Sequence, residues 1–178
     1  MEKVIEIDGK QVKFRATAAI PRLYRIKFGR DIMQDMKSVR DAMQEAKDGK
    51  KSIPPKFLEI FENISYLMAK HADPSMEAKS VEEWLDGFEA FSIYSIFPQL
   101  FALWSANNAT IANPKKKSRP VDREMNTALF LLRAAQLGIP IRDLELLTVG
   151  MVTDMMIEAG NDKCEYAMLP TQEDFDSF

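Results

Sequence analysis

The 178-residue sequence contains one cysteine, one histidine and no long apolar run. Cys164 alone cannot form an intrachain disulfide or a thiolate metal cage. His71 has no second histidine with which to build a zinc site or a catalytic triad. No apolar run approaches the roughly 20 residues that span a bilayer, and the N-terminus reads Met-Glu-Lys-Val-Ile-Glu-Ile-Asp, unlike a secretory leader. These absences predict a soluble protein of a reducing, intracellular compartment.

Motifs of common catalytic sites are also absent. The sequence has no G-x-x-x-x-G-K-[ST], G-x-G-x-x-G, G-x-S-x-G or H-E-x-x-H pattern. Adjacent carboxylates such as Glu82 and Glu83 are expected on solvent faces, without an apolar pocket to shift their pKa values. We therefore expect no enzyme, no cofactor and no metal. The open alternative is a small cytosolic hydrolase or transferase whose site forms only in the fold.

Charge is distributed unevenly along the chain. Residues 9–30 hold seven cations and no acid, whereas residues 143–178 hold nine acids and one lysine. No aromatics interleave with the cations as nucleic-acid stacking requires, so the pattern favours the solvated side of an amphipathic helix. A DNA-associated helical protein using residues 10–30 stays an alternative. An acidic protein partner also stays open, with Arg22 and Arg25 as candidate contacts.

Local patterns predict a mainly α fold that begins with a β-hairpin. Asp8-Gly9 separates two short alternating runs, and glycine accepts the positive φ of hairpin turns. A lone hairpin is marginal in water, so it should pack on a compact multi-helix bundle. Apolar periodicity and capping residues predict helices that begin at Thr17, Asp31, Pro55, Ser80, about Ile93, Asp122, Ile141 and Thr148. Their expected stops include Gly29, Gly138 and Gly160, and Pro98 either kinks one helix or starts a second.

The segment 113–120 divides the chain. Two prolines bracket four cations and a serine, and no large apolar side chain is present to be buried. We expect a basic, solvated linker between a domain of residues 1–112 and a small helical extension of residues 121–178 with an acidic tail.

Two features of the extension suggest contact with partners. Four of the eleven methionines lie between positions 151 and 168, and Met151 and Met155 are candidate contacts because thioethers adapt to varied surfaces. Ordinary gap-filling in a small core explains them equally well. The end of the chain is either disordered or a docking peptide, with candidate contacts Glu173, Asp174, Phe175 and Phe178.

Five stretches together resemble a known family. They are residues 7–16, 21–31, 93–104 (Ile-Tyr-Ser-Ile-Phe-Pro-Gln-Leu-Phe-Ala-Leu-Trp), 146–158 and 171–178. The sequence resembles the tail assembly chaperones of long-tailed bacteriophages, especially those of phages and prophages of Gram-positive hosts. The matching stretches cover most of the chain, and they are structural patterns without a catalytic signature.

The resemblance implies a function. In that family a short protein and a longer version, made by programmed ribosomal frameshifting, coat the tape measure protein and keep it soluble. The extension of the longer version recruits major tail (tube) subunits, and both forms act in the host cytoplasm and are absent from the finished virion. This chain resembles the longer version, and the ribosomal frameshift is expected at the codons of the lysines at residues 115–117. Implied partners are the tape measure protein, the tube protein and other chaperone copies, with no nucleic acid or membrane.

Overall fold

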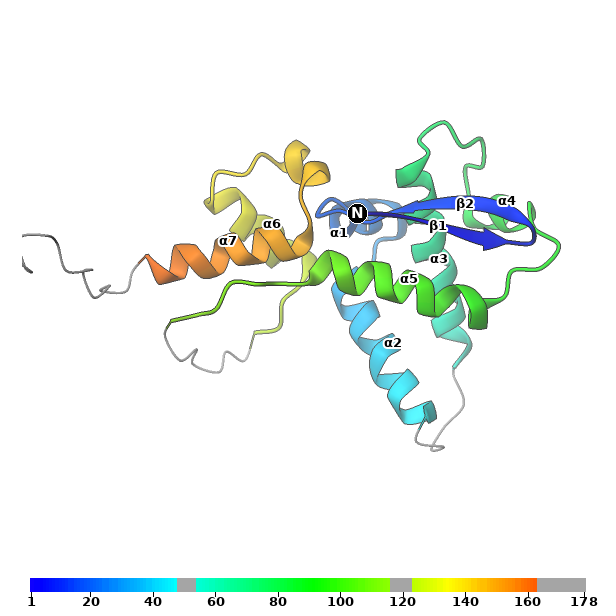
Figure 1. Ribbon diagram of the computed structural model, residues 1–178, viewed down its shortest axis with the longest axis horizontal. Coiled ribbons are helices and arrows are strands. Elements are labelled where there is room, and N and C mark those ends of the chain that lie inside the picture. The colour runs from blue at the N-terminus through cyan, green and yellow to red at the C-terminus, as the bar shows by residue number, and fades with distance from the viewer. Residues whose placement is uncertain (48–53, 116–122, 163–178) are drawn as a thin grey trace, which may run out of the picture.

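The computed structural model describes residues 1–47, 54–115 and 123–162. Its elements are β1 (Glu2–Ile7), β2 (Lys10–Arg15), α1 (Ile20–Phe28), α2 (Ile32–Lys47), α3 (Pro55–Ala72), α4 (Val81–Leu85), α5 (Ile93–Asn108), α6 (Thr127–Gln136), the 3-10 helix η1 (Ile141–Leu146) and α7 (Val149–Asn161). Figure 1 shows the hairpin lying over α3 at one end, with α6, η1 and α7 at the other. The predicted class is confirmed: a hairpin packed on helices, followed by a helical C-terminal part.

The hairpin forms as its turn residues require. Asp8 and Gly9 both have positive φ, 51° and 70°, which is the geometry of a two-residue turn matched to strand twist. β1 and β2 pair antiparallel, with Ile7 opposite Lys10. Ile5, Ile7 and Phe14 are fully buried, because alternate side chains of a strand point to one face. That face rests mainly on α3, and β1 also contacts α5.

A large hydrophobic cluster joins the hairpin to α1–α5. Trp84 of α4 lies at its centre and meets the rings of Phe14, Tyr66, Phe88 and Phe91 at centroid distances of 5.3–6.4 Å. α5 is one continuous helix with Pro98 inside it, so the prolyl ring does not start a second helix. Leu103 of α5 is buried, whereas Tyr94 near the start of the same helix is 82% exposed.

A second, smaller cluster packs the extension onto the start of α1. Ala18 and Ala19 lie against buried side chains of α6, η1, α7 and the segment before η1, namely Phe130, Ala134, Ile139, Leu144, Val149 and Val152. The N–H of Ala18 donates to the carbonyl of Leu147 over 2.7 Å. α7 begins where α5 ends (Figure 1), and a Cβ atom at Gly150 would overlap the Ala109 carbonyl oxygen. The described part of the extension is therefore docked on the preceding residues.

The predicted linker begins within this docked region. The side chain of Asn161 accepts a hydrogen bond from the N–H of Lys115 over 2.9 Å and donates one to the carbonyl of Asn113 over 3.1 Å. The carboxylate of Asp154 accepts hydrogen bonds from the N–H groups of Ile111 and Ala112. The remainder of the linker, residues 116–120, lies outside the described residues.

Some predicted helix boundaries are confirmed. Gly29 and Gly138 follow α1 and α6 with φ of 67° and 78°, as left-handed residues past a helix C-terminus do. The Thr148 hydroxyl accepts from the N–H of Met151 over 3.0 Å and caps α7. Ser80 caps α4 by accepting from Glu83 N–H. The Glu83 carboxylate accepts from Lys79 N–H, whereas a reciprocal capping box would have it accept from Ser80 N–H.

Other boundaries were predicted wrongly. α6 begins at Thr127, where the Asn126 side chain caps it by accepting from Leu129 N–H; the predicted cap, Asp122, lies outside the described residues. Thr17 does not cap α1, because its hydroxyl accepts from Ala19 N–H ahead of the helix. α7 continues past Gly160 to Asn161, whose side chain is engaged with the 113–115 segment.

Candidate partner-binding surfaces

An open groove of about 680 Å³ lies between α2 and α5 and is closed at one end by the extension. We call it the α2–α5 groove. α2 contributes Met33 and Met36, and α5 contributes Phe101, Trp104, Ser105 and Asn108, because residues three and four apart share a side of a helix. The extension adds Met125, Phe130, Val149 and Thr153. The floor of the groove is therefore apolar, and Met125 at its edge is 45% exposed.

Charged side chains stand along the α2 side of this groove. Lys37 forms an ion pair with Glu124, which precedes α6, and the hydrogen bond to that carboxylate raises the pKa of Lys37. Arg40, one turn further, is exposed and lies 3.8 Å from the carboxylate of Asp41. An apolar floor with a charged rim is the arrangement that receives an amphipathic helix.

Asp31 fixes the extension relative to α2 and so shapes the groove. Its carboxylate accepts from Met33 N–H at the start of α2 and, over 2.8 Å, from Thr127 N–H at the start of α6. Arg25 of α1 lies 3.9 Å from the same carboxylate. One side chain thus joins the beginnings of two helices that are 96 residues apart in the sequence, and its negative charge suits both helix N-termini.

A neighbouring network holds α1 against α2. The hydroxyl of Tyr24 and the guanidinium of Arg30 both donate to the carboxylate of Asp35, each over 2.8 Å. Burial by itself raises the pKa of Asp35, but the hydrogen bonds from Arg30 and Tyr24 outweigh it and the net pKa is lowered. Burial, with the Asp35 contact, raises the pKa of Tyr24. The polar groups of Tyr24, Arg30 and Asp35 are hydrogen-bonded to one another, so their role is to stabilise the fold.

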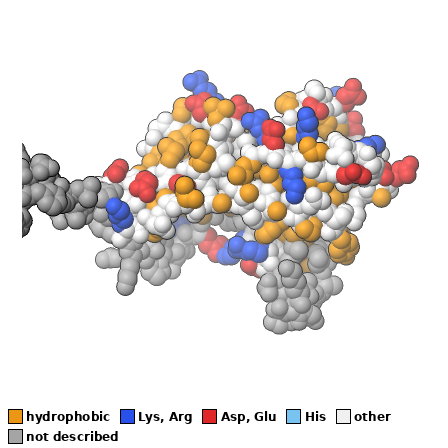
Figure 2. Space-filling model, in the orientation of Figure 1, with side chains coloured by type: hydrophobic (Ala, Val, Ile, Leu, Met, Phe, Trp, Pro, Cys, Tyr) orange, Lys and Arg blue, Asp and Glu red, His pale blue; other side chains and the backbone are white. Residues whose placement is uncertain are grey.

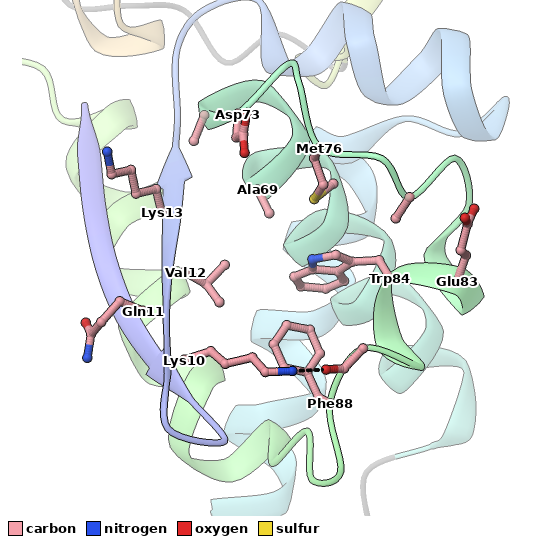
Figure 3. A pocket seen from close by; sticks show the side chains of 13 residues that line it. Lys10, Gln11, Val12, Lys13, Ala69, Asp73, Met76, Glu83, Trp84 and Phe88 are labelled. Carbon is pink, nitrogen blue, oxygen red and sulfur yellow. Dashed lines mark hydrogen bonds between the residues drawn. The ribbon is translucent and has the colours of Figure 1, made fainter.

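A second open pocket, of about 700 Å³, lies between β2 and α4 (Figure 3). Val12, Trp84 and Phe88 give it apolar walls. Lys10 reaches across to donate to the carbonyl of Gly87, with its Nζ over the Phe88 ring at 5.6 Å from the centroid. Its charged lining consists of Lys10 and Lys13 with Asp73 and Glu83. Two cations against two acids leave no net charge with which to select a partner.

Most of the seven cations of residues 9–30 bind groups of this protein. Lys10, Arg15 and Lys27 donate to backbone carbonyls of Gly87, Glu145 and Lys79, while Arg30 and Arg25 face Asp35 and Asp31. The Nε atom of Arg22 is buried without a hydrogen-bond partner among the described residues. The candidates Arg22 and Arg25 are thus not brought together as a free cationic face. Sequence could not show the engagement of Lys10, Arg15 and Lys27, because their acceptors lie 77, 130 and 52 residues away.

Met151 and Met155 lie on one side of α7, 51% and 42% exposed, with exposed Leu146 just before the helix. Figure 2 shows hydrophobic side chains gathered over the part of the molecule formed by α6, η1 and α7. The other candidates, Glu173, Asp174, Phe175 and Phe178, lie outside the described residues. The α2–α5 groove was missed from sequence. The local signal for it in the sequence is the helical spacing of the apolar residues Ile32, Met36 and Val39, which are buried along α2.

Comparison of the chain with protein-family models, with curated proteins and with solved structures gives no match. Within residues 1–47, 54–115 and 123–162, no group of three or more His, Cys, Asp or Glu side chains is placed to hold a metal ion. None of the helices in those ranges has both the length and the apolar character needed to cross a bilayer.

Proposed function

We propose that this protein is a bacteriophage tail assembly chaperone that binds amphipathic helical segments of the tape measure protein in the α2–α5 groove. The observation that supports this most is the groove itself, an apolar floor between two helices with charged residues along one side. Methionines at the floor and edge suit a long partner whose successive segments differ, because thioether side chains repack easily.

The groove also suits the task of coating. A long helical chain with an exposed apolar face aggregates unless that face is covered. Many copies that each cover a short segment weakly hold such a chain in solution, because neighbouring contacts on one chain reinforce each other. Each copy can then be released singly as the tube assembles. Contacts between the open groove and the tape measure protein exchange readily, because the partner does not have to leave a deep, enclosed pocket.

In this proposal the chain is the longer member of a frameshift pair and acts in the host cytoplasm before leaving the assembled tail. The extension recruits tube subunits through the Met151 and Met155 face of α7. Because Met125, Phe130 and Val149 belong to the extension and line the groove, the longer form should also hold the tape measure protein more firmly than a form ending near residue 113. Other copies of the chaperone bind alongside on the same partner.

Co-expression with the cognate tape measure protein tests the proposal. The full chain should move the tape measure protein from the insoluble to the soluble fraction, with several copies bound per chain. Met125→Glu places a charge at the edge of the apolar groove and should reduce the soluble fraction several-fold. Tyr94→Glu is the matched control, since Tyr94 is also exposed and apolar but lies on α5 outside the groove lining.

The results with these variants distinguish the α2–α5 groove from the other exposed surfaces. If the wild-type chain leaves the tape measure protein insoluble, the proposed function is wrong. If Tyr94→Glu abolishes solubilisation and Met125→Glu does not, the groove is the wrong surface. The double variant Met151→Glu/Met155→Glu should retain solubilisation and lose capture of purified tube protein; retained capture would contradict the assignment of the α7 face.

A further inference from the structure

The chain itself contains a segment whose chemistry matches the α2–α5 groove. We propose that residues 171–178 of the same chain dock in this groove, with Phe175 and Phe178 on its apolar floor, and compete there with the helical partner. The docking depends only on the groove and the tail sequence, whereas the competition rests on the function proposed above. The tail is therefore a built-in substitute that covers the groove when no partner is bound.

The segment after α7 is long enough for the tail to reach the groove. Val149 and Thr153 of α7 line the groove, and α7 ends at Asn161. At 1.5 Å per helical residue, Thr153 and Asn161 are about 12 Å apart along the axis. The 14 residues from Asn161 to Phe175 can span up to about 46 Å when extended. The tail is therefore long enough to run back along α7 to the groove.

The tail and the groove are chemically complementary. Phe175 and Phe178 are three residues apart, the spacing at which two side chains can face one surface together. Met33 and Met36 have the same spacing on α2. Glu173, Asp174 and Asp176 adjoin Phe175 and Phe178 in the sequence. The α2 side of the groove carries Lys37, which pairs with Glu124, and Arg40, which lies 3.8 Å from Asp41. Aromatic anchors supply most of such a contact, and the acids orient it and make it sensitive to salt.

The other open surfaces fit this tail less well. In the pocket between β2 and α4 the lysines are matched by Asp73 and Glu83, so an acidic segment gains nothing there. Glu158 lies one turn after Met155 on α7, and Asp162 follows the end of that helix, so like charges oppose an acidic segment there. Among these three surfaces, the α2–α5 groove alone combines an apolar floor with more lining cations, Lys37 and Arg40, than lining acids, of which Glu124 is one.

Methionine methyl NMR on the full-length protein tests the docking, because each surface carries its own methionines. Compared with the wild type, Phe175→Ala/Phe178→Ala should shift the methyl resonances of Met33, Met36 and Met125. Met76 in the other pocket and Met151 and Met155 on α7 should stay in place. Ser177→Ala, between the two aromatics, is the matched control and should shift none of them. Raising the salt concentration should move the wild-type resonances towards those of the double variant.

Several results would overturn the docking. Shifts confined to Met151 and Met155, or to Met76, would place the tail on another surface. Unchanged resonances throughout would show that the tail does not dock. Shifts that vanish on dilution would assign the groove to the tail of a second copy and not to the same chain.

Competition is measured with a synthetic peptide from an amphipathic segment of the cognate tape measure protein. The Phe175→Ala/Phe178→Ala protein should bind this peptide several-fold more tightly than wild type, because no tail has to be displaced. Equal affinity would overturn the competition. Failure of both proteins to bind would count against the proposed function, while the methyl shifts still decide the docking.

Discussion

The two hydrophobic clusters of this molecule are built on different principles. The larger one, formed by the hairpin and α1–α5, is filled by bulky side chains gathered around Trp84. The smaller one places Ala18 and Ala19 against the extension. Small residues let backbones approach closely, as the hydrogen bond from Ala18 N–H to the Leu147 carbonyl shows. The first cluster depends on side-chain volume, and the second on room left for the backbone.

Polar contacts differ in the same way. The extension is held by hydrogen bonds between segments distant in sequence: Asp31 with Thr127, Arg15 with Glu145, Asp154 with Ile111, and Asn161 with Lys115. Each is a directional contact that a small displacement breaks, whereas the packing of the larger cluster is spread over many atoms. Disturbance of the smaller cluster should therefore release the extension while the larger cluster stays folded.

The largest effect is expected in the larger cluster. Phe14→Ala removes a fully buried ring that contacts Trp84 and should lower the free energy of unfolding by about 3–5 kcal/mol. Urea denaturation followed by tryptophan fluorescence measures this, since Trp84 and Trp104 both belong to the larger cluster. Val4→Ala, on the exposed face of the same hairpin, should change little. A loss at Phe14 no greater than that at Val4 would contradict the comparison.

Gly150→Ala tests the smaller cluster. The added Cβ atom has no room beside the Ala109 carbonyl, so α7 must move off α5, at a cost of about 1–3 kcal/mol. Trypsin should then cut faster at Arg133 and Arg142, while the tryptophan-detected midpoint stays nearly unchanged.

Gly160→Ala in the same helix is the matched control. A Cβ atom there meets nothing within 4 Å, and alanine should stabilise the helix by about 0.5–1 kcal/mol. Equal trypsin sensitivity of the two glycine variants would show that close approach of α5 and α7 does not hold the extension.

Asp31→Ala should separate the starts of α2 and α6. It removes the acceptor shared by Met33 N–H and Thr127 N–H and should cost about 1–2 kcal/mol, the usual value for a lost helix cap. Hydrogen exchange should speed up at the first turn of both helices. Asp41→Ala, an exposed acid on α2, is the control, and faster exchange in α2 alone would remove the proposed link to the extension.

The smallest effect is expected from pH. Burial, helped by the charge of Arg15, lowers the pKa of His71, whose ring lies 3.0 Å from the Thr17 hydroxyl. A histidine pKa lowered by folding means that the unfolded chain binds the proton more readily. Its contribution to stability is thus present above the unfolded pKa, near 6.5, and is lost as pH falls below that value and through the lowered pKa of the folded state. Thermal melts at pH 7.5 and 5.5 should show a smaller decrease for His71→Gln than for wild type.

Much of this fold follows from short stretches of sequence. Asp8-Gly9 determines the hairpin, apolar periodicity determines the helices, and Gly29, Gly138 and Thr148 mark their ends. Each of these depends on backbone preferences and hydrogen bonds among residues a few positions apart, so a local pattern contains the information.

The tertiary structure alone decided where the surfaces lie. α6 is capped by Asn126 and not by Asp122, next to the hydrogen bond between Thr127 N–H and Asp31. Arg25 also lies against the Asp31 carboxylate. The α2–α5 groove combines Met33, Phe101 and Met125, which come from three separate segments. No periodicity relates such residues, because their proximity results from the packing of whole helices and from the room that Gly150 and the two alanines leave for it.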